Sequence, residues 1–308
     1  HGRMVKRELV WVKGIVVGLI LLILSGLGVR EWDRSQVVGH SQYRFNMAVI
    51  VPDSGVTFIS FDPKESSVLA LPFPTDLAIN GRSSGEYSIA SLYKLGSYNG
   101  KGGMFARQKI QGFMRVPVPG YVVVNGEYKN VRRTFTKGML VALFGKNETS
   151  LSRFDAAILL LRGGRYAWRE VGESELVRAA VIEKKEGSSI YHPERLQEYV
   201  GTRLFDWGIG ETGVTVAIIN ASGENGLGSD LADFLSNLGL DVVMVRSVSG
   251  SEILDTSVWQ IEATDNVEEM TYIFENLFGF DEPKLEKVPG EFRSIVLVRV
   301  GKDAKELF

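Results

Sequence analysis

The chain of 308 residues is long enough for roughly two domains, and 44% hydrophobic with 23% charged residues excludes a chain that is disordered throughout. Its 35 basic and 37 acidic side chains give a net charge of −2, so composition provides no basic footprint for nucleic acid. The absence of cysteine excludes disulfide scaffolds, cysteine nucleophiles and thiolate metal sites, and three widely separated histidines do not favour a histidine-rich metal centre.

The first element in chain order is an apolar stretch at residues 14–29 (GIVVGLILLILSGLGV), which carries no charge. With the apolar residues just before it, the stretch reaches about 20 residues, the length of a helix that crosses a bilayer. Basic residues dominate before it and acidic residues balance them after it, which predicts a cytoplasmic tail at residues 1–13 and an extracytoplasmic bulk. A cleaved signal peptide and a buried core helix are alternatives, but length and unbroken apolarity favour one retained transmembrane helix in the cell membrane.

Residues 30–44 are polar and are expected to form a linker. After them, residues 45–205 alternate β-branched or aromatic runs with Gly, Pro and Ser breaks, which is typical of short strands. The runs predict strands at residues 47–51, 56–61, 67–73 and 121–124. Residues 155–161 (DAAILLL) are expected to be buried, and residues 173–185 and 193–200 to be helical. This mixture predicts an α/β or α+β domain.

A second module is predicted at residues 212–303. Its strands are expected at residues 214–220, 241–248, 257–263 and 293–300. Leu231, Phe234, Leu235 and Leu238 have the spacing of one helix face, and a second apolar stripe predicts a helix over residues 265–279. The order β-α-β-β-α-β favours a two-layer α+β sandwich.

The second module resembles the C-terminal domain of LytR-type cell-envelope proteins. That family shows a strand ending in Asn, a Gly-containing turn, an amphipathic helix, and then a glycine before a valine-rich strand. The matching positions are Asn220, Gly226, Gly228, Leu231, Ala232, Leu235 and Gly239. The G-x-x-G-x-G spacing of this turn differs from the dinucleotide fingerprint, so a tight turn and helix start is the favoured interpretation. The resemblance implies a protein of the bacterial cell envelope.

The upstream domain is similar, more weakly, to the catalytic LytR-CpsA-Psr (LCP) domain. Four pieces occur in the family's order: ISFDPKESSV at residues 59–68, PFPTD at 72–76, YSIASLYKLGSYNGKGG at 87–103 and PGYVVVNG at 119–126. The resemblance implies an Mg²⁺-dependent phosphotransferase that moves a polyprenyl-pyrophosphate-linked glycopolymer onto the cell wall.

Departures from the LCP pattern fall on the residues that carry the family's chemistry. The resemblance places Ser54 where active members hold Mg²⁺ with an aspartate, although Asp53 is adjacent and Asp76 is retained as a second metal candidate. Thr75 stands where the family's arginine grips pyrophosphate. The later arginine pair of the family has no counterpart between residues 126 and 201, and the pairs Arg132-Arg133 and Lys184-Lys185 are expected to be solvated.

The replacement of arginine by Thr75 weakens the catalytic hypothesis. Phosphoryl transfer needs fixed cations for the charge on the phosphate oxygens, and a hydroxyl cannot replace a bidentate guanidinium. Arg82, Lys101 and Arg107 are phosphate-binding candidates from new positions, although solvated surface cations are the commoner case.

The sequence therefore favours a degenerate LCP-like domain in a non-catalytic scaffold or binding module. Its expected partners are the membrane, wall polymer, a lipid-linked precursor or envelope proteins, with no nucleic acid. No cofactor is expected, except Mg²⁺ in the alternative in which the phosphotransferase is active. A transcriptional regulator is disfavoured because the chain has no DNA-binding footprint.

Overall fold

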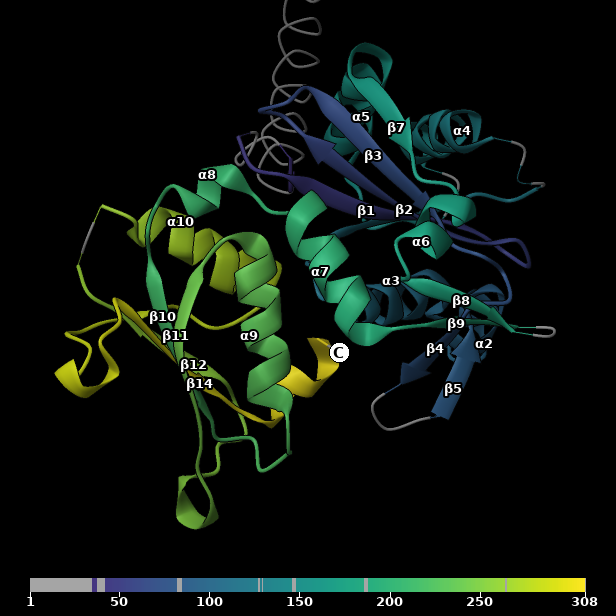
Figure 1. The fold of residues 1–308 in the computed structure, drawn as a ribbon. Coiled ribbons are helices and arrows are strands. Elements are labelled where there is room, and N and C mark those ends of the chain that lie inside the picture. Colours follow the sequence, from purple (N-terminus) through teal and green to yellow (C-terminus); the bar gives the residue numbers. More distant parts are fainter. Residues whose placement is uncertain are drawn as a thin grey trace, which may run out of the picture.

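The computed structural model describes residues 35–37, 42–81, 85–126, 128, 130–145, 148–185, 188–263 and 265–307. These residues form an N-terminal unit (residues 45–204) and a C-terminal unit (residues 207–307), each built around one five-stranded sheet (Figure 1). The predicted transmembrane helix at residues 14–29 lies outside the described residues. Within the described part of the chain, no helix has the length and apolarity needed to span a bilayer.

The N-terminal sheet has the strand order β6-β1-β2-β3-β7. The three central strands are antiparallel, and the two edge strands run parallel to their neighbours. Every residue of β1 and β2 is buried, because helices cover both faces of the sheet. The strands are β1 (Phe45–Val51), β2 (Gly55–Asp62), β3 (Ser67–Pro72), β6 (Gly120–Val123) and β7 (Ala167–Glu170).

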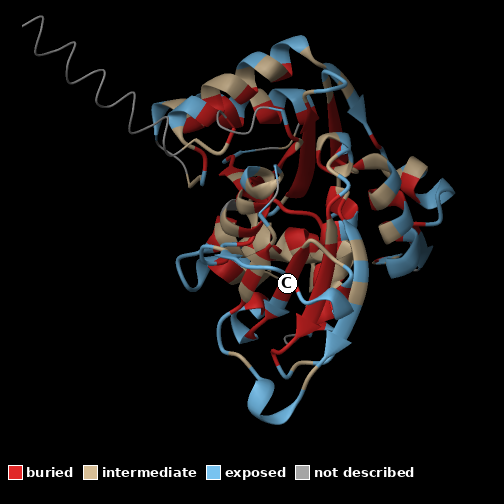
Figure 2. Ribbon diagram, turned by 90° about the vertical axis from the view of Figure 1, so that its left-hand side faces the viewer, coloured by how far each residue is buried: buried red, intermediate tan, exposed pale blue. Residues whose placement is uncertain are grey.

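Two cores fill the spaces between this sheet and its helices. One core joins alternate residues of the sheet to α3 (Gly102–Met114) and α7 (Pro193–Arg203). The other joins the opposite face of the sheet to α4 (Val131–Phe144) and α5 (Arg153–Arg165). Buried positions therefore concentrate on the strands and on the helix sides turned toward them (Figure 2). The N-terminal unit is a three-layer α/β/α sandwich.

Two predictions for the N-terminal unit are corrected. Residues 155–161, expected to be buried, lie in α5, an amphipathic helix on which Asp155 is fully buried while Leu161 is 61% exposed. The helix expected over residues 173–185 ends early: α6 spans Glu173–Arg178, and β8 (Ile182–Lys185) follows it. Ala180 has a φ of 55°, a left-handed conformation that cannot continue a helix.

The C-terminal sheet has the strand order β11-β10-β14-β12-β13. The predicted β-α-β-β-α-β order is present, with the short β13 added before the last strand. The helices α9 and α10 pack on one face, and Val288 and Phe292 cover the other. The elements are β10 (Thr215–Asn220), α9 (Leu227–Leu238), β11 (Asp241–Ser247), β12 (Val258–Ile261), α10 (Val267–Thr271) with its π-helical continuation η3 (Tyr272–Leu277), β13 (Lys284–Leu285) and β14 (Val296–Val300).

Smaller elements connect these layers. Two hairpins, β4–β5 and β8–β9, flank the α3 side of the N-terminal unit, and η5 closes the C-terminal unit against α3. The bounds are β4 (Ala78–Gly81), β5 (Gly85–Ser88), η1 (Ile89–Ser91), α2 (Leu92–Ser97), β9 (Ser188–Tyr191), α8 (Trp207–Gly210), η2 (Gly250–Glu252), η4 (Gly290–Phe292) and η5 (Lys302–Leu307).

The segment before β1 binds both units. Val37 is 1% exposed and belongs to the core beneath α4 and α5. Tyr43 belongs to the core of the C-terminal unit, where its ring stacks on Tyr272 at a centroid distance of 5.4 Å. Next to Tyr43 in the chain, the Arg44 guanidinium pairs with Asp62 in β2, while the Arg44 backbone N–H donates to Asp206 Oδ2 at 2.6 Å. A linker was expected at residues 30–44. Val37, Tyr43 and Arg44, which the structure describes in this segment, instead pack against the two folded units.

The direct interface between the units centres on Arg115, which follows α3 in a left-handed conformation with φ 49°. Its guanidinium pairs with Asp233 and, at 3.0 Å, with Asp230, both on α9. Asn237 on α9 donates to the Arg115 carbonyl at 2.8 Å and to Gln197 Oε1 on α7 at 2.9 Å. These contacts fix α9 against α3 and α7.

Candidate functional site

The turn that carries Asp53 lies beside the segment that carries Thr75. Asp53 is exposed in the β1–β2 turn with φ 60°, a left-handed conformation that aspartate tolerates better than most residues. A Cβ built on Gly55, two residues later, would lie 3.5 Å from Thr75 Cγ2. The structure therefore brings the two loops named by the LCP resemblance together, with a methyl and hydroxyl group where an arginine was expected.

Asp76 makes contacts that hold the β8–β9 hairpin. Its Oδ2 accepts a hydrogen bond from Ser189 Oγ at 3.0 Å and lies 3.9 Å from Lys184 Nζ. Lys184 also donates to Glu173 Oε1 at 2.6 Å, and this hydrogen bond raises the Lys184 pKa. The Asp76 carboxylate thus faces a hydroxyl and an ammonium group, the contacts of a structural aspartate.

The two phosphate-binding candidates that the structure describes, Lys101 and Arg107, line different cavities. Lys101, the N-cap of α3, lines a cavity of about 300 Å³ together with Lys109 and Lys305. Arg107 lines a different cavity of about 380 Å³ between α3 and the C-terminal unit, where Nη1 donates to the Val118 carbonyl at 3.0 Å. Burial lowers the Arg107 pKa. The third candidate, Arg82, lies outside the described residues.

The start of α3 already holds a carboxylate. The Gly103 backbone N–H donates to Glu148 Oε1 at 2.8 Å, and a Cβ on Gly103 would meet the Tyr121 ring at 2.3 Å. Burial, followed by the charge of Glu148, raises the Tyr121 pKa. Gly103, at the end of the glycine-rich stretch at residues 98–103, therefore packs closely on Tyr121 and Glu148.

These residues do not fit the Mg²⁺ site that the LCP resemblance implies. Among the described residues, no group of three or more His, Asp or Glu side chains is arranged to hold a metal ion. Asp53 stands in an exposed turn, and Asp76 faces Lys184. We therefore derive no chemical step through a metal.

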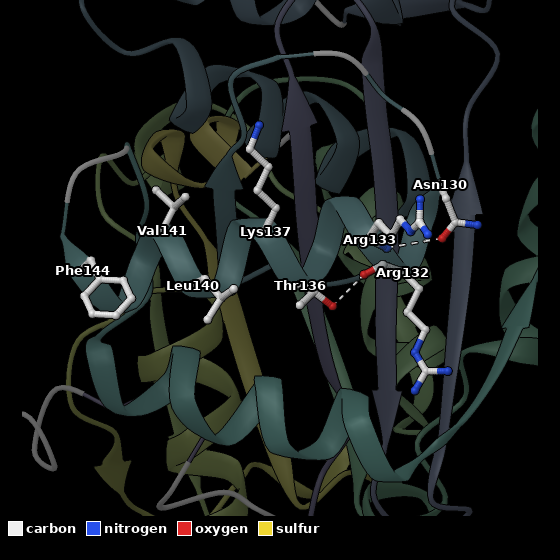
Figure 3. A pocket seen from close by; sticks show the side chains of 8 residues that line it. All are labelled: Asn130, Arg132, Arg133, Thr136, Lys137, Leu140, Val141 and Phe144. Atoms are coloured by element: carbon white, nitrogen blue, oxygen red, sulfur yellow. Dashed lines mark hydrogen bonds between the residues drawn. The ribbon is translucent and has the colours of Figure 1, made fainter.

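A larger open groove, of about 1100 Å³, lies over the outward side of α4. Figure 3 shows its graded chemistry, with Arg132 and Arg133 toward the start of α4 and Leu140 and Phe144 toward its end. Phe144 is 74% exposed. The described lining residues are Asn130, Arg132, Arg133, Thr136, Lys137, Leu140, Val141 and Phe144.

Local contacts fix the polar end of the groove. Asn130 caps α4 by accepting from the Arg133 backbone N–H at 3.3 Å. Arg132 Nη2 lies 3.5 Å from the Gly163 carbonyl on α5, and Lys137 Nζ donates to the Asn125 carbonyl at 2.6 Å. In the described part of the chain, these cations have carbonyl partners and no carboxylate partner. The groove thus presents net positive charge beside apolar side chains.

Sequence reasoning treated Arg132 and Arg133 as an ordinary solvated pair. Both are exposed, as expected, but both line the groove over α4. The available signal was the helical spacing of residues 131–144: Val131, Phe135, Met139 and Ala142 form the buried side, which leaves Leu140 and Phe144 outside. Apolar residues on both sides of an otherwise amphipathic helix indicate a second contact surface.

The turn between β10 and α9 contains Asn220, Gly226 and Gly228. Asn220 Oδ1 accepts from Ser222 Oγ at 2.6 Å, and Asn220 Nδ2 donates to the Glu224 carbonyl at 2.8 Å. Gly226 is the N-cap of α9 with φ 81°, a conformation that favours glycine. A Cβ on Gly228 would meet Asn220 Cβ at 2.9 Å. These residues build the strand-to-helix turn.

Comparison with known proteins identifies the C-terminal segment. Residues 213–303 match the family model described as "LytR cell envelope-related transcriptional attenuator", which confirms the resemblance predicted for this module. A search of curated proteins found no match to the chain.

Solved structures that resemble the chain include TagT and TagV of Bacillus subtilis. TagT is 13% identical with a TM-score of 0.36, over 52% of this chain and 89% of TagT. TagV is 10% identical with a TM-score of 0.33, over 51% of this chain and 94% of TagV. A transcriptional regulator from Enterococcus faecalis is 12% identical with a TM-score of 0.37, over 51% of this chain and 85% of that chain. One TagT structure is titled as a LytR-CPS2A-psr family protein with bound octaprenyl pyrophosphate lipid.

Proposed function

We propose that this chain is a membrane-anchored cell-envelope protein that binds a lipid-linked precursor of wall polymer without transforming it. The proposed anchor is the apolar stretch at residues 14–29, with residues 1–13 in the cytoplasm and the two folded units outside. The family match at residues 213–303 supports an envelope role. The ligand class follows from the groove over α4.

The observation that carries the proposal is the graded chemistry of this groove. A polyprenyl phosphate joins a compact anionic group to a branched hydrocarbon chain. The guanidinium groups of Arg132 and Arg133 and the ammonium group of Lys137 suit phosphate oxygens. Leu140 and Phe144, at the other end of the groove, offer apolar contact for the first isoprene units.

The absence of catalysis is proposed from the contacts of the candidate catalytic residues. Thr75 cannot supply the fixed positive charge that an arginine would provide, and Asp76 accepts from Ser189 beside Lys184. The groove lies over α4, on the face of the sheet opposite α3, whereas Asp76 holds the β8–β9 hairpin on the α3 side. The alternative is an active Mg²⁺-dependent glycopolymer phosphotransferase, with Asp53 or Asp76 as metal ligands.

The test is a titration of a soluble fragment, residues 35–308, with a short-chain polyprenyl pyrophosphate in the presence and absence of Mg²⁺. The proposal predicts saturable binding in both conditions. Lys137→Gln should weaken binding roughly tenfold, because a hydrogen bond to a charged group contributes about 1.5–3 kcal/mol. Lys185→Gln, at an exposed lysine on β8, is the matched control and should leave binding unchanged.

A second pair of variants tests the apolar end of the groove. Leu140 and Val243 have nearly equal exposed fractions, 43% and 42%, but Val243 lies on β11 of the C-terminal unit. Leu140→Ser should weaken binding of the prenylated ligand and leave binding of inorganic pyrophosphate unchanged, while Val243→Ser should change neither. Equal effects of the two substitutions, or no saturable binding, would exclude the groove as the ligand site.

A further inference from the structure

Four exposed apolar side chains and several cations share the outward side of α4 and α5. The apolar residues are Leu140, Phe144, Phe154 and Leu161. The exposed cations are Arg132, Arg133, Lys137, Arg153 and Arg165. Because both helices pack through one core on the same face of the sheet, their exposed sides face away from it together. We call this surface the α4–α5 face.

The charge of the α4–α5 face differs from that of the whole chain. The chain carries a net charge of −2. The residues of α4 include no acid, and the only acid of α5 is Asp155, which is fully buried and accepts hydrogen bonds at the start of its own helix. The face is therefore strongly cationic in a slightly acidic protein, the complement of a surface of anionic headgroups.

The polypeptide enters the folded region beside this face. Ser35 Oγ donates to Asp155 Oδ1 at 2.5 Å, the Val37 backbone N–H donates to the same oxygen at 3.0 Å, and the Gln36 N–H donates to Oδ2 at 3.3 Å. Asp155 lies in the first turn of α5, and neighbouring Arg153 approaches Gly145 at the end of α4, 3.3 Å from a Cβ built there. The entry point thus adjoins the apolar end of α4.

The length of chain between this entry point and the apolar stretch limits the distance to the bilayer. Residue 29 ends the stretch, and Ser35 is already fixed on α5. Six residues extend over at most about 21 Å. If residues 14–29 cross the membrane, the start of α5 and the end of α4 lie within that distance of the bilayer surface.

We infer that the α4–α5 face lies on the membrane, with its cations against anionic phospholipid headgroups and Phe144 and Leu140 in the interface. This inference rests on the membrane anchor of the proposed function and adds an orientation to it. It places the open groove where a prenyl chain can enter from the bilayer without crossing water. An apolar helix end flanked by cations is the pattern of surfaces that bind at the interface.

The experiment uses the full chain in vesicles, because the natural absence of cysteine allows single labels. Leu140→Cys and Val243→Cys, matched in exposed fraction, each carry a fluorophore, and a brominated lipid in the bilayer serves as the quencher. Vesicles contain phosphatidylcholine with or without phosphatidylglycerol, and flotation confirms that the chain is inserted. We expect several-fold stronger quenching at position 140 than at position 243 in anionic vesicles.

Charge reversal on α5 separates this inference from ligand binding. The double variant Arg153→Glu/Arg165→Glu changes two residues of α5 that are not among the residues that line the groove. Each basic residue near an anionic surface shifts the docked-to-free ratio by about fivefold, so this pair should strongly reduce quenching at position 140. Titration with polyprenyl pyrophosphate should be unchanged by the same pair, so failure of docking and failure of ligand binding are distinct results. Equal quenching at positions 140 and 243, or quenching unaffected by charge reversal, would overturn the inference.

Discussion

The carboxylate of Asp155 joins the chain that precedes β1 to the start of α5. It accepts from Ser35 and Val37, and its Oδ2 accepts from the Ser152 backbone N–H at 3.1 Å in a capping box. Asp155→Ala would remove the cap and leave buried donors unpaired. We expect a loss of about 2–4 kcal/mol in the free energy of unfolding, measured by chemical denaturation.

Asp53→Asn is the control for Asp155→Ala. Asp53 is exposed in a turn with φ 60°, a conformation that asparagine also tolerates. This substitution should change the free energy of unfolding by less than about 0.5 kcal/mol. A similar loss for both variants would show that the Asp155 contacts do not stabilise the fold.

The raised pKa of Asp206 makes the free energy of unfolding depend on pH. Its carboxylate accepts from the Arg44 N–H at 2.6 Å and the Gly208 N–H at 2.9 Å, but burial is the larger influence and raises the Asp206 pKa. The folded state therefore binds a proton between the ordinary and the raised pKa, and this group adds stability as pH falls through that window. The Asp206→Asn variant has no carboxylate at this position, so it cannot bind this proton.

The measurement for Asp206 is denaturation of wild type and Asp206→Asn at several pH values. The stability of the variant minus that of wild type should decrease as pH falls from neutral through the window just above the ordinary carboxyl pKa. A difference that is constant or that increases over this range would contradict the assignment.

Two adjacent glycines in α5 test the packing of the α4–α5 layer. A Cβ on Gly163 would lie 2.6 Å from the Phe135 ring of α4, whereas a Cβ on Gly164 would meet nothing within 4 Å. Gly163→Ala should lower the free energy of unfolding by about 1–3 kcal/mol because buried Phe135 must shift. Gly164→Ala should raise it by about 0.5–1 kcal/mol because alanine favours the helix. Thermal denaturation that shows the same sign for both would contradict the packing.

The elements that the sequence predicts well are those in which periodicity and burial agree. The stripe of Leu231, Phe234, Leu235 and Leu238 is the buried side of α9, and the apolar run at residues 47–51 lies in β1, a central strand. The prediction that residues 155–161 are buried was wrong, because they lie in α5, which has exposed apolar residues. Continuous apolarity does not distinguish a buried segment from a helix with a second apolar side. Of the site candidates, Asp53 and Thr75 lie on adjoining loops, but Lys101 and Arg107 line separate cavities, which one-dimensional spacing cannot reveal.

At the scale of the whole molecule, the segment before β1 connects the two units. Tyr43 precedes the N-terminal sheet, yet its ring lies in the C-terminal core on Tyr272. No local pattern predicts this contact, because its partner is more than two hundred positions away in the sequence. Local patterns also do not predict the contacts of Arg115 with its partners on α9, which are more than one hundred positions away.

Tyr43→Ala should therefore destabilise the C-terminal unit. Removal of a buried aromatic ring costs about 3 kcal/mol, and we expect faster hydrogen exchange in β10 and β14. Tyr98→Ala, at a tyrosine that is 77% exposed, is the control and should change the free energy of unfolding by less than about 0.5 kcal/mol. Faster exchange confined to the N-terminal sheet would contradict the bridging role of Tyr43.

The central claim is that the chain binds a lipid-linked precursor without transferring its phosphoryl group. The most direct measurement is product release from a polyprenyl-pyrophosphate-linked glycan incubated with the chain and Mg²⁺, followed for wild type and Asp76→Ala. We predict bound, unchanged ligand and no released polyprenyl phosphate with either protein. Mg²⁺-dependent release by wild type that is lost in Asp76→Ala would contradict the claim and establish a phosphotransferase.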